Sequence, residues 1–174
     1  MSSTTTREAT TREATISEAT ISADPTVPLI RIEREFDAPP EKVFRAHVDP
    51  ELFRRWIGPR GSNMEIDHYD ARTGGSFRYG GSSEGQEYWF RGCFHEVRAN
   101  QVIVQTFTWE EQPDGVALER LELHDLGNGR TRLVVTSLVD SFEDRDAWLQ
   151  SGMEVGVNDG YEKLDEILAG SADG

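Results

Sequence analysis

The sequence contains one cysteine and four histidines, and this scarcity limits the chemistry that the chain can carry. Cys93 has no partner for a disulfide within the chain, which is typical of a protein of the reducing cytoplasm. The histidines are scattered without the spacing of metal ligands, so we expect neither a metal nor a cofactor in the fold. Phosphate loops, dinucleotide-binding fingerprints and hydrolase motifs such as G-x-S-x-G are also missing, which leaves no catalytic residue to assign.

Long hydrophobic runs and basic residues are scarce as well. No run of about 18 apolar residues exists, and no basic and apolar leader opens the chain, so we expect no membrane insertion and no secretion. Lys and Arg number 18 against 32 Asp and Glu, which gives a net charge of −14. Because an acidic surface repels phosphate groups, nucleic acid is not an expected partner. The predicted compartment is the cytoplasm.

The chain divides into a repetitive start and a patterned remainder. Residues 6–25 read TREAT, TREAT, ISEAT and ISADP, a decaying repeat of five that matches neither the period of a helix nor that of a strand. We therefore predict a disordered tail over residues 1–27, whose role the sequence leaves open, and a disordered end over residues 171–174. Eight Phe, four Trp and four Tyr supply the core of one domain over residues 28–170.

The apolar pattern of this domain predicts an α+β fold. Alternation indicates a first strand over residues 29–36, and Asp37-Ala38-Pro39-Pro40 indicates the start of two short helices. Turn residues then separate six further strands, at 64–71, 76–80, 87–98, 101–111, 116–126 and 130–139. A final helix over residues 143–169 is either continuous or broken near Ser151-Gly152. We expect a curved antiparallel sheet of about seven strands, covered by this last helix.

Three glycines stand out in the final helix. Gly152, Gly156 and Gly160 recur at every fourth position and would lie in one row on the helix surface. Each costs about 1 kcal/mol relative to alanine in a helix interior, so something must offset them. The row indicates either a kink or close helix–sheet contact, or an open cavity that the missing side chains leave above the sheet.

Polar residues in the apolar phase of a strand are the second candidate feature. Arg34, His68, Glu96 and Glu119 share a phase with apolar neighbours, although the phase of the strand over residues 87–98 is ambiguous. Such residues either reach water or a salt bridge at a strand end, or converge as polar anchors in a small-molecule pocket. In the second case His68, or Glu119 with a raised pKa, is a candidate general base.

Seven motifs resemble one known family when they are read in order. They are Phe36-Asp37-Ala38-Pro39, Asp49-Pro50 with Trp56-x-Gly58-Pro59, Gly74-Gly75-x-Phe77-x-Tyr79, Phe90-x-Gly92-x-Phe94-x-Glu96, Thr106-Phe107-x-Trp109, Asp125-Leu126-x-Asn128-Gly129-x-Thr131 and Ser151-Gly152-Met153. Over residues 29–169 the chain resembles the family named for the activator of heat-shock protein 90 ATPase homologue, within the START-like (SRPBCC, pollen-allergen-like) superfamily. The motifs are chiefly fold-determining, so the resemblance implies no catalytic residue.

The resemblance implies a helix-grip fold, in which the sheet wraps around the C-terminal helix and leaves a cavity between them. Superfamily members bind lipids, sterols, polyketides or other apolar molecules there, and some catalyse cyclisation. The eukaryotic chaperone activators carry a separate N-terminal domain, whereas 27 repetitive residues stand in its place here, which disfavours a co-chaperone role.

We therefore predict a protein that binds a small hydrophobic or aromatic molecule, such as a lipid or a polyketide. A cyclase- or aromatase-like enzyme with the same cavity and a chaperone-associated stress protein are the alternatives, and a homodimer is left open. The expected ligand-binding residues are Trp56, His68, Phe77, Tyr79, Phe107, Trp109, Glu119, Met153, Gly156 and Val157.

Overall fold

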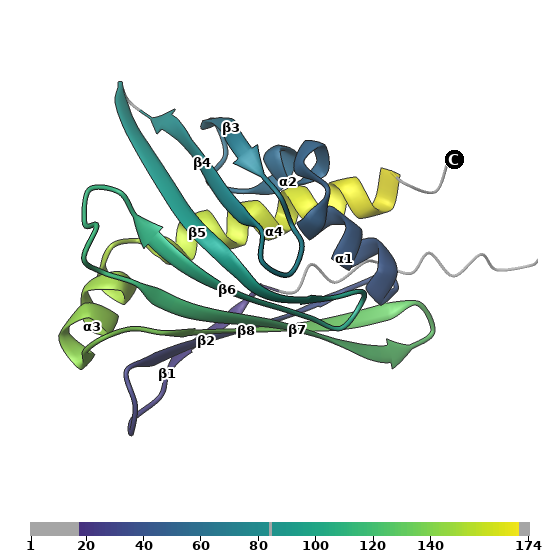
Figure 1. The fold of residues 1–174 in the computed structure, drawn as a ribbon. Helices are drawn as coiled ribbons and strands as arrows, with labels where there is room; N and C mark the ends of the chain where they lie inside the picture. Colours follow the sequence, from purple (N-terminus) through teal and green to yellow (C-terminus); the bar gives the residue numbers. More distant parts are fainter. Residues whose placement is uncertain (1–17, 84, 171–174) are drawn as a thin grey trace, which may run out of the picture.

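The structure is a computed structural model that describes residues 18–83 and 85–170. Four helices and eight strands are present in this part of the chain (Figure 1). In chain order they are β1 (Thr20–Ala23), β2 (Leu29–Phe36), α1 (Pro40–Val48), α2 (Pro50–Trp56), β3 (Asn63–Tyr69), β4 (Ser76–Ser83), β5 (Gln86–Arg98), β6 (Val102–Trp109), β7 (Ala117–Gly127), β8 (Arg130–Leu138), α3 (Phe142–Gln150) and α4 (Met153–Gly170). None of the helices in these two stretches has the length and hydropathy needed to cross a membrane.

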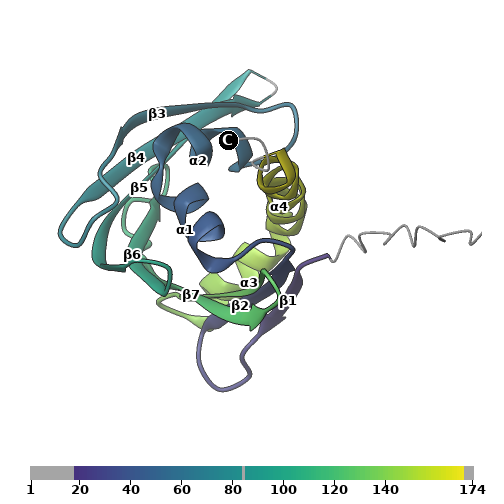
Figure 2. The ribbon, with the colours of Figure 1, turned by 90° about the vertical axis from the view of Figure 1, so that its right-hand side faces the viewer.

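The strands form one antiparallel sheet in the order β1-β2-β8-β7-β6-β5-β4-β3. In Figure 2 the sheet curls around α1 and α2, and α4 stands in the gap between its two edges. The predicted α+β helix-grip fold is therefore confirmed. The sheet has eight strands where the sequence predicts about seven.

The additional strand is β1, which lies inside the segment predicted to be a disordered tail. Its residues pair in antiparallel register with β2, from Thr20 opposite Glu33 to Ala23 opposite Ile30. Ile21 packs against the core, and Ala19 donates a backbone hydrogen bond of 3.0 Å to Oδ1 of Asn158 on α4. The prediction of disorder is thus wrong for residues 18–27. The segment buries little apolar surface, but its backbone also pairs with β2, and this pairing helps to hold it in place. The predictions for residues 1–17 and 171–174 lie outside the described residues.

Side-chain caps mark the starts of two of the helices. Asp49 caps α2 by accepting a hydrogen bond of 3.0 Å from the backbone nitrogen of Glu51, and Pro50 occupies its first turn. Ser141 caps α3 in the same way, because its Oγ accepts a hydrogen bond of 3.1 Å from the backbone nitrogen of Asp144. The expected final helix is broken: α3 ends at Gln150 and α4 starts at Met153, since Gly152 between them adopts φ 82°.

Two register shifts interrupt the sheet. One lies in β3 between Ile66 and His68, and the other lies in β5 between Phe94 and Glu96. A bulge inserts one residue into a strand, so the side chains that follow it exchange faces. The strict alternation used to predict inward-facing residues therefore fails after each of these points.

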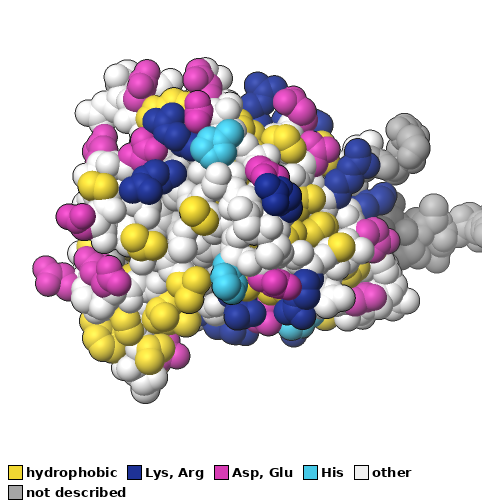
Figure 3. Space-filling view, viewed as in Figure 1, with side chains coloured by type: hydrophobic (Ala, Val, Ile, Leu, Met, Phe, Trp, Pro, Cys, Tyr) yellow, Lys and Arg dark blue, Asp and Glu magenta, His cyan; other side chains and the backbone are white. Residues whose placement is uncertain are grey.

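The face shown in Figure 3 mixes charges of both signs with apolar side chains. Apolar side chains gather around the start of α3 and the turn between β1 and β2, where Val27, Leu138 and Phe142 are exposed. Inside the curled sheet, four strand residues and one residue of α4 are buried almost completely, namely Phe36, Phe77, Phe94 and Leu133 and, on α4, Leu164. The core thus lies between the concave face of the sheet and α4.

Candidate ligand cavity

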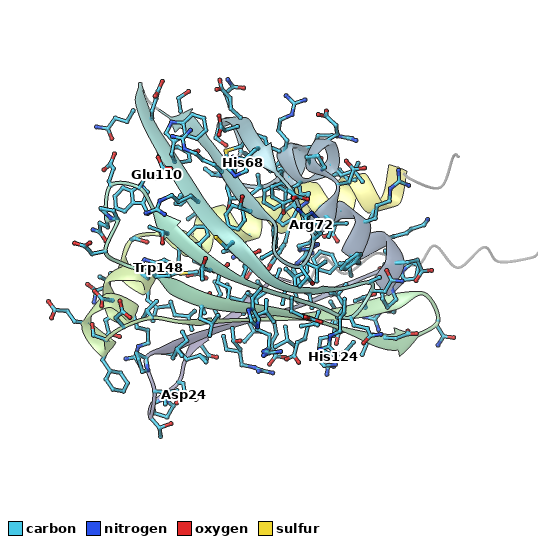
Figure 4. All side chains as sticks on the ribbon, in the orientation of Figure 1. Asp24, His68, Arg72, Glu110, His124 and Trp148 are labelled. Atoms are coloured by element: carbon cyan, nitrogen blue, oxygen red, sulfur yellow. The ribbon has the colours of Figure 1, made fainter. Side chains whose placement is uncertain are left out.

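A cavity of about 870 Å³ lies between the concave face of the sheet and the helices α2, α3 and α4. Its mouth is marked by exposed lining residues, namely Glu87 in β5, Glu111 after β6, and Gly152 and Val155 at the α3–α4 junction. Figure 4 shows Trp148 on α3 and Glu110 just after β6 at this same end of the molecule. The cavity therefore opens between two strand ends and the break in the final helix.

Aromatic side chains from the sheet and from α3 form part of its wall. The rings of Phe90 and Phe107 are stacked with centroids 4.9 Å apart, and Trp148 meets Phe107 edge-on at 5.7 Å. Tyr79 lies 5.6 Å from Phe77 and 5.7 Å from Phe90. These contacting rings pack against one another and also line the cavity.

A polar row crosses this apolar surface. Gln105 on β6 stands opposite Glu119 on β7, which stands opposite Ser137 on β8. Nε2 of Gln105 donates to Oε2 of Glu119, and Oγ of Ser137 donates to Oε1, each at 2.9 Å. Burial raises the pKa of the Glu119 carboxyl, and the two hydrogen bonds oppose that rise only in part. The row therefore holds an ionisable group in the middle of an aromatic cavity.

The three glycines of the predicted row have three different roles. Gly152 takes the left-handed conformation that ends α3, so it is not part of a helix row. A Cβ at Gly160 would lie 3.1 Å from the carbonyl oxygen of Trp56, which makes this glycine a close contact between α4 and α2. At Gly156 a Cβ would meet only Cδ of Pro59, at 3.9 Å, and this residue lines the cavity with Met153 and Val157. Gly160 thus makes a close contact with α2 and not with the sheet, whereas Gly156 lines the cavity.

Nine of the ten expected ligand-binding residues line this cavity, and His68 does not. They are Trp56, Phe77, Tyr79, Phe107, Trp109, Glu119, Met153, Gly156 and Val157. His68 is exposed, with Nδ1 3.1 Å from Oδ2 of Asp67 and Nε2 3.0 Å from Oγ of Ser76. The bulge after Ile66 turns it to the outer face, so the expectation that His68 acts in the cavity is wrong.

The other two expected anchors also lie elsewhere. Glu96 follows the bulge in β5 and pairs with Arg98 at 3.3 Å. Arg34 points inward as predicted, but it is buried against α4, where Nη2 donates to Oδ2 of Asp165 at 2.6 Å. Its guanidinium lies 4.8 Å from the ring centre of Phe36. Arg34 therefore fastens α4 to the sheet and does not line the cavity.

Several lining residues escaped the sequence analysis. Gln105 and Ser137 carry the same signal as Glu119, a polar residue in an apolar strand phase, and could have been found by it. His47 is buried on α1, with Nδ1 2.8 Å from the carbonyl oxygen of Val43, and burial lowers its pKa to about 4. Trp148 gave no signal, since α3 buries none of its residues.

The arrangement suits binding of an apolar molecule better than metal chemistry. Within the part of the chain that the structure describes, no three His, Cys, Asp or Glu side chains come together to hold a metal ion. Nε1 of Trp109 is buried and has no hydrogen-bond acceptor among the described residues. Glu119 is the ionisable group best placed to meet a bound molecule.

Comparison with known proteins places the chain in a family. The model of the family described as "Activator of Hsp90 ATPase homolog 1-like protein" matches residues 37–169. A crystal structure of a protein from Rhodobacter sphaeroides is similar at 25% identity and a TM-score of 0.79, over 88% of this chain and 99% of that one. A solution structure from Arthrobacter aurescens shares the fold at 24% identity and a TM-score of 0.78, over 88% and 92% of the two chains.

A crystal structure of a protein from Chromobacterium violaceum matches at 26% identity and a TM-score of 0.70, over 80% of this chain and 96% of that one. Among curated proteins no sequence match is found. The family match covers most of the chain, and the shared fold agrees with it. The chain therefore belongs to the family of activator of Hsp90 ATPase homolog 1-like proteins, within the START-like (SRPBCC) superfamily.

Proposed function

We propose that the protein binds a small hydrophobic or aromatic molecule in the cavity beneath α4. The observation that carries the proposal is a cavity of about 870 Å³ whose wall is mainly apolar and includes many aromatic rings. Ligand pockets of proteins typically measure about 300–1,000 Å³ and combine apolar walls with a few placed polar groups. The exposed Cys93, without a disulfide, supports action in the reducing cytoplasm.

A thermal-shift screen tests this proposal. Lipids, flavonoids and polyketide-like aromatics are added to the full chain, and a ligand that binds the folded state raises the unfolding temperature. Gly156→Leu fills the cavity from α4 and should abolish the shift while leaving the protein folded. Ala169→Leu, at an exposed position near the end of the same helix, is the matched control. No shift with any compound, together with a more stable Gly156→Leu, would show that the cavity is ordinary packing.

Glu119 favours one alternative, a cyclase- or aromatase-like reaction in the same cavity. Its carboxyl has a raised pKa and lines the space where the ligand would lie, as a general acid or base requires. If the protein is such an enzyme, Glu119→Gln removes turnover but retains binding. The family description also names a chaperone activator, and an unchanged ATPase rate of the host's Hsp90 would remove that role.

A further inference from the structure

The charges that line the cavity all have one sign. Glu87 and Glu111 lie at the mouth, and Glu119 lies inside. Among the described residues that line the cavity there is no Lys and no Arg. His47 stays neutral near pH 7, because burial lowers its pKa to about 4. A molecule that enters therefore meets carboxylates and aromatic rings, and no fixed positive charge.

The carboxyl of Glu119 is left without a charged partner in the described structure. Its two hydrogen-bond donors, Gln105 and Ser137, are neutral, and each carboxylate oxygen can accept a further hydrogen bond. The contrast is Arg34, a charged residue between the sheet and α4, which has Asp165 at 2.6 Å. A half-buried carboxylate without a counter-charge is partly desolvated, so a cation brought by the ligand would gain more here than at the surface.

The aromatic walls around Glu119 also favour a positively charged ligand. Phe107 and Trp109 come from β6, the strand that also carries Gln105, and Tyr79 and Trp148 line the cavity from β4 and α3. The faces of aromatic rings carry negative partial charge and attract ammonium groups, most strongly where water is excluded. Carboxylate and aromatic faces together therefore select against an anionic head group such as that of a fatty acid.

We propose that the cavity takes a hydrophobic amine, an apolar or aromatic body with one protonated nitrogen that donates to the carboxylate of Glu119. This inference rests on the proposed binding function and narrows it to one class of ligand. The body of the ligand packs against Phe107 and Tyr79, and its nitrogen lies at the polar row of Gln105, Glu119 and Ser137. The acidic mouth residues and the net charge of −14 draw such cations toward the opening.

Three probes of equal shape test the inference by titration calorimetry on the full chain. They are 2-naphthylmethylamine, 2-naphthalenemethanol and 2-naphthoic acid, which are cationic, neutral and anionic at pH 7.5. The amine should bind about tenfold or more tightly than the alcohol, because only the cation satisfies the charge of Glu119, and the acid should bind worst. Glu119→Gln should lower the affinity for the amine to that for the alcohol and leave the alcohol unchanged.

Glu41→Gln is the matched control, since it removes an exposed carboxylate on α1 that does not line the cavity, and it should change the amine's affinity less than about threefold. Circular dichroism confirms that each variant is folded. If the unmodified protein bound the amine and the alcohol with equal affinity, the proposal that the ligand is an amine would be overturned. The proposed function would still stand. Tighter binding of the acid would overturn the amine proposal as well. If no probe binds and the thermal-shift screen also fails, both the inference and the proposed function fall.

Discussion

Glu119 and His47 are ionisable residues that line the cavity, and burial drives each toward its neutral form. For the carboxyl this means a raised pKa, and for the imidazole a lowered one. A shifted pKa is also a statement about stability, because the folded and unfolded states then bind different numbers of protons. The two residues should affect the free energy of unfolding in opposite directions as the pH falls.

Replacing Glu119 by glutamine should stabilise the protein at neutral pH. The folded pKa lies above the ordinary value of 4.5, so the folded state binds more protons between the two values, and stability is lost as the pH rises through them. Glutamine keeps the shape without the charge, and Ser137 and Gln105 can reorient to hydrogen-bond its amide. We expect a gain of about 1 kcal/mol at pH 7 that shrinks toward zero at pH 4, measured by urea unfolding. A less stable variant at pH 7 would contradict this.

Replacing His47 should reduce the sensitivity of the protein to acid. Its pKa falls from 6.5 to about 4 on folding, so the unfolded chain takes up a proton first and stability is lost as the pH drops through this range. The full shift corresponds to about 3 kcal/mol. His47→Phe keeps a ring beside Trp56, 4.8 Å away, and removes the titration. Urea unfolding at pH 7 and pH 4.5 should show a smaller loss in the variant, and equal losses would refute the assignment.

At the scale of helices and strands, Gly156 and Gly160 provide a matched pair on α4. Gly156→Ala places a methyl group in open space, so the gain in helix propensity should stabilise the protein by up to about 1 kcal/mol. Gly160→Ala brings Cβ within 3.1 Å of the carbonyl of Trp56, and α2 or α4 must shift. We expect a net loss of about 1 kcal/mol, measured by urea unfolding. If both substitutions changed the free energy of unfolding by similar amounts, the surroundings of Gly156 and Gly160 would not differ in solution as they do in the structure.

The helices and strands show which sequence patterns were sufficient to predict the fold and the cavity residues, and which were not. Alternation within regular strands placed Phe107, Trp109 and Glu119 on the inner face, where all three line the cavity. His68 was misplaced because a bulge in β3 exchanges the faces of the strand, and nothing in its composition marks that bulge. Strand β1 was missed because an edge strand depends on its partner's backbone more than on its own side chains.

At the scale of the whole molecule, the cavity depends on where α4 is held. Arg60 donates its backbone N–H to Asp159 at 2.9 Å and its guanidinium to Glu162 and Glu166, at 3.3 and 2.8 Å. On the opposite side, Arg34 holds Asp165. These links join residues about 100 or more positions apart in the sequence. The helix-grip fold could be predicted from local patterns and the resemblance, whereas the depth of α4, and with it the size of the cavity, could not.

The net charge of −14 is the last whole-molecule property with a measurable consequence. Salt screens the repulsion among excess carboxylates, but it also weakens exposed ion pairs such as those of Arg60 with Glu162 and Glu166. Exposed pairs contribute about 0–1 kcal/mol each, and acidic residues outnumber basic ones by 32 to 18, so we expect repulsion to dominate.

The unfolding temperature should therefore rise by several degrees between about 0.02 and 0.2 M NaCl, where the Debye length falls from roughly 20 to 7 Å, and level off above. KCl should act identically, because screening depends on ionic strength and not on the cation. The double variant Glu111→Gln and Glu154→Gln removes two exposed charges and should show a smaller rise. A fall in the unfolding temperature over this range would mean that ion pairs, and not the excess of carboxylates, set the electrostatic contribution to stability.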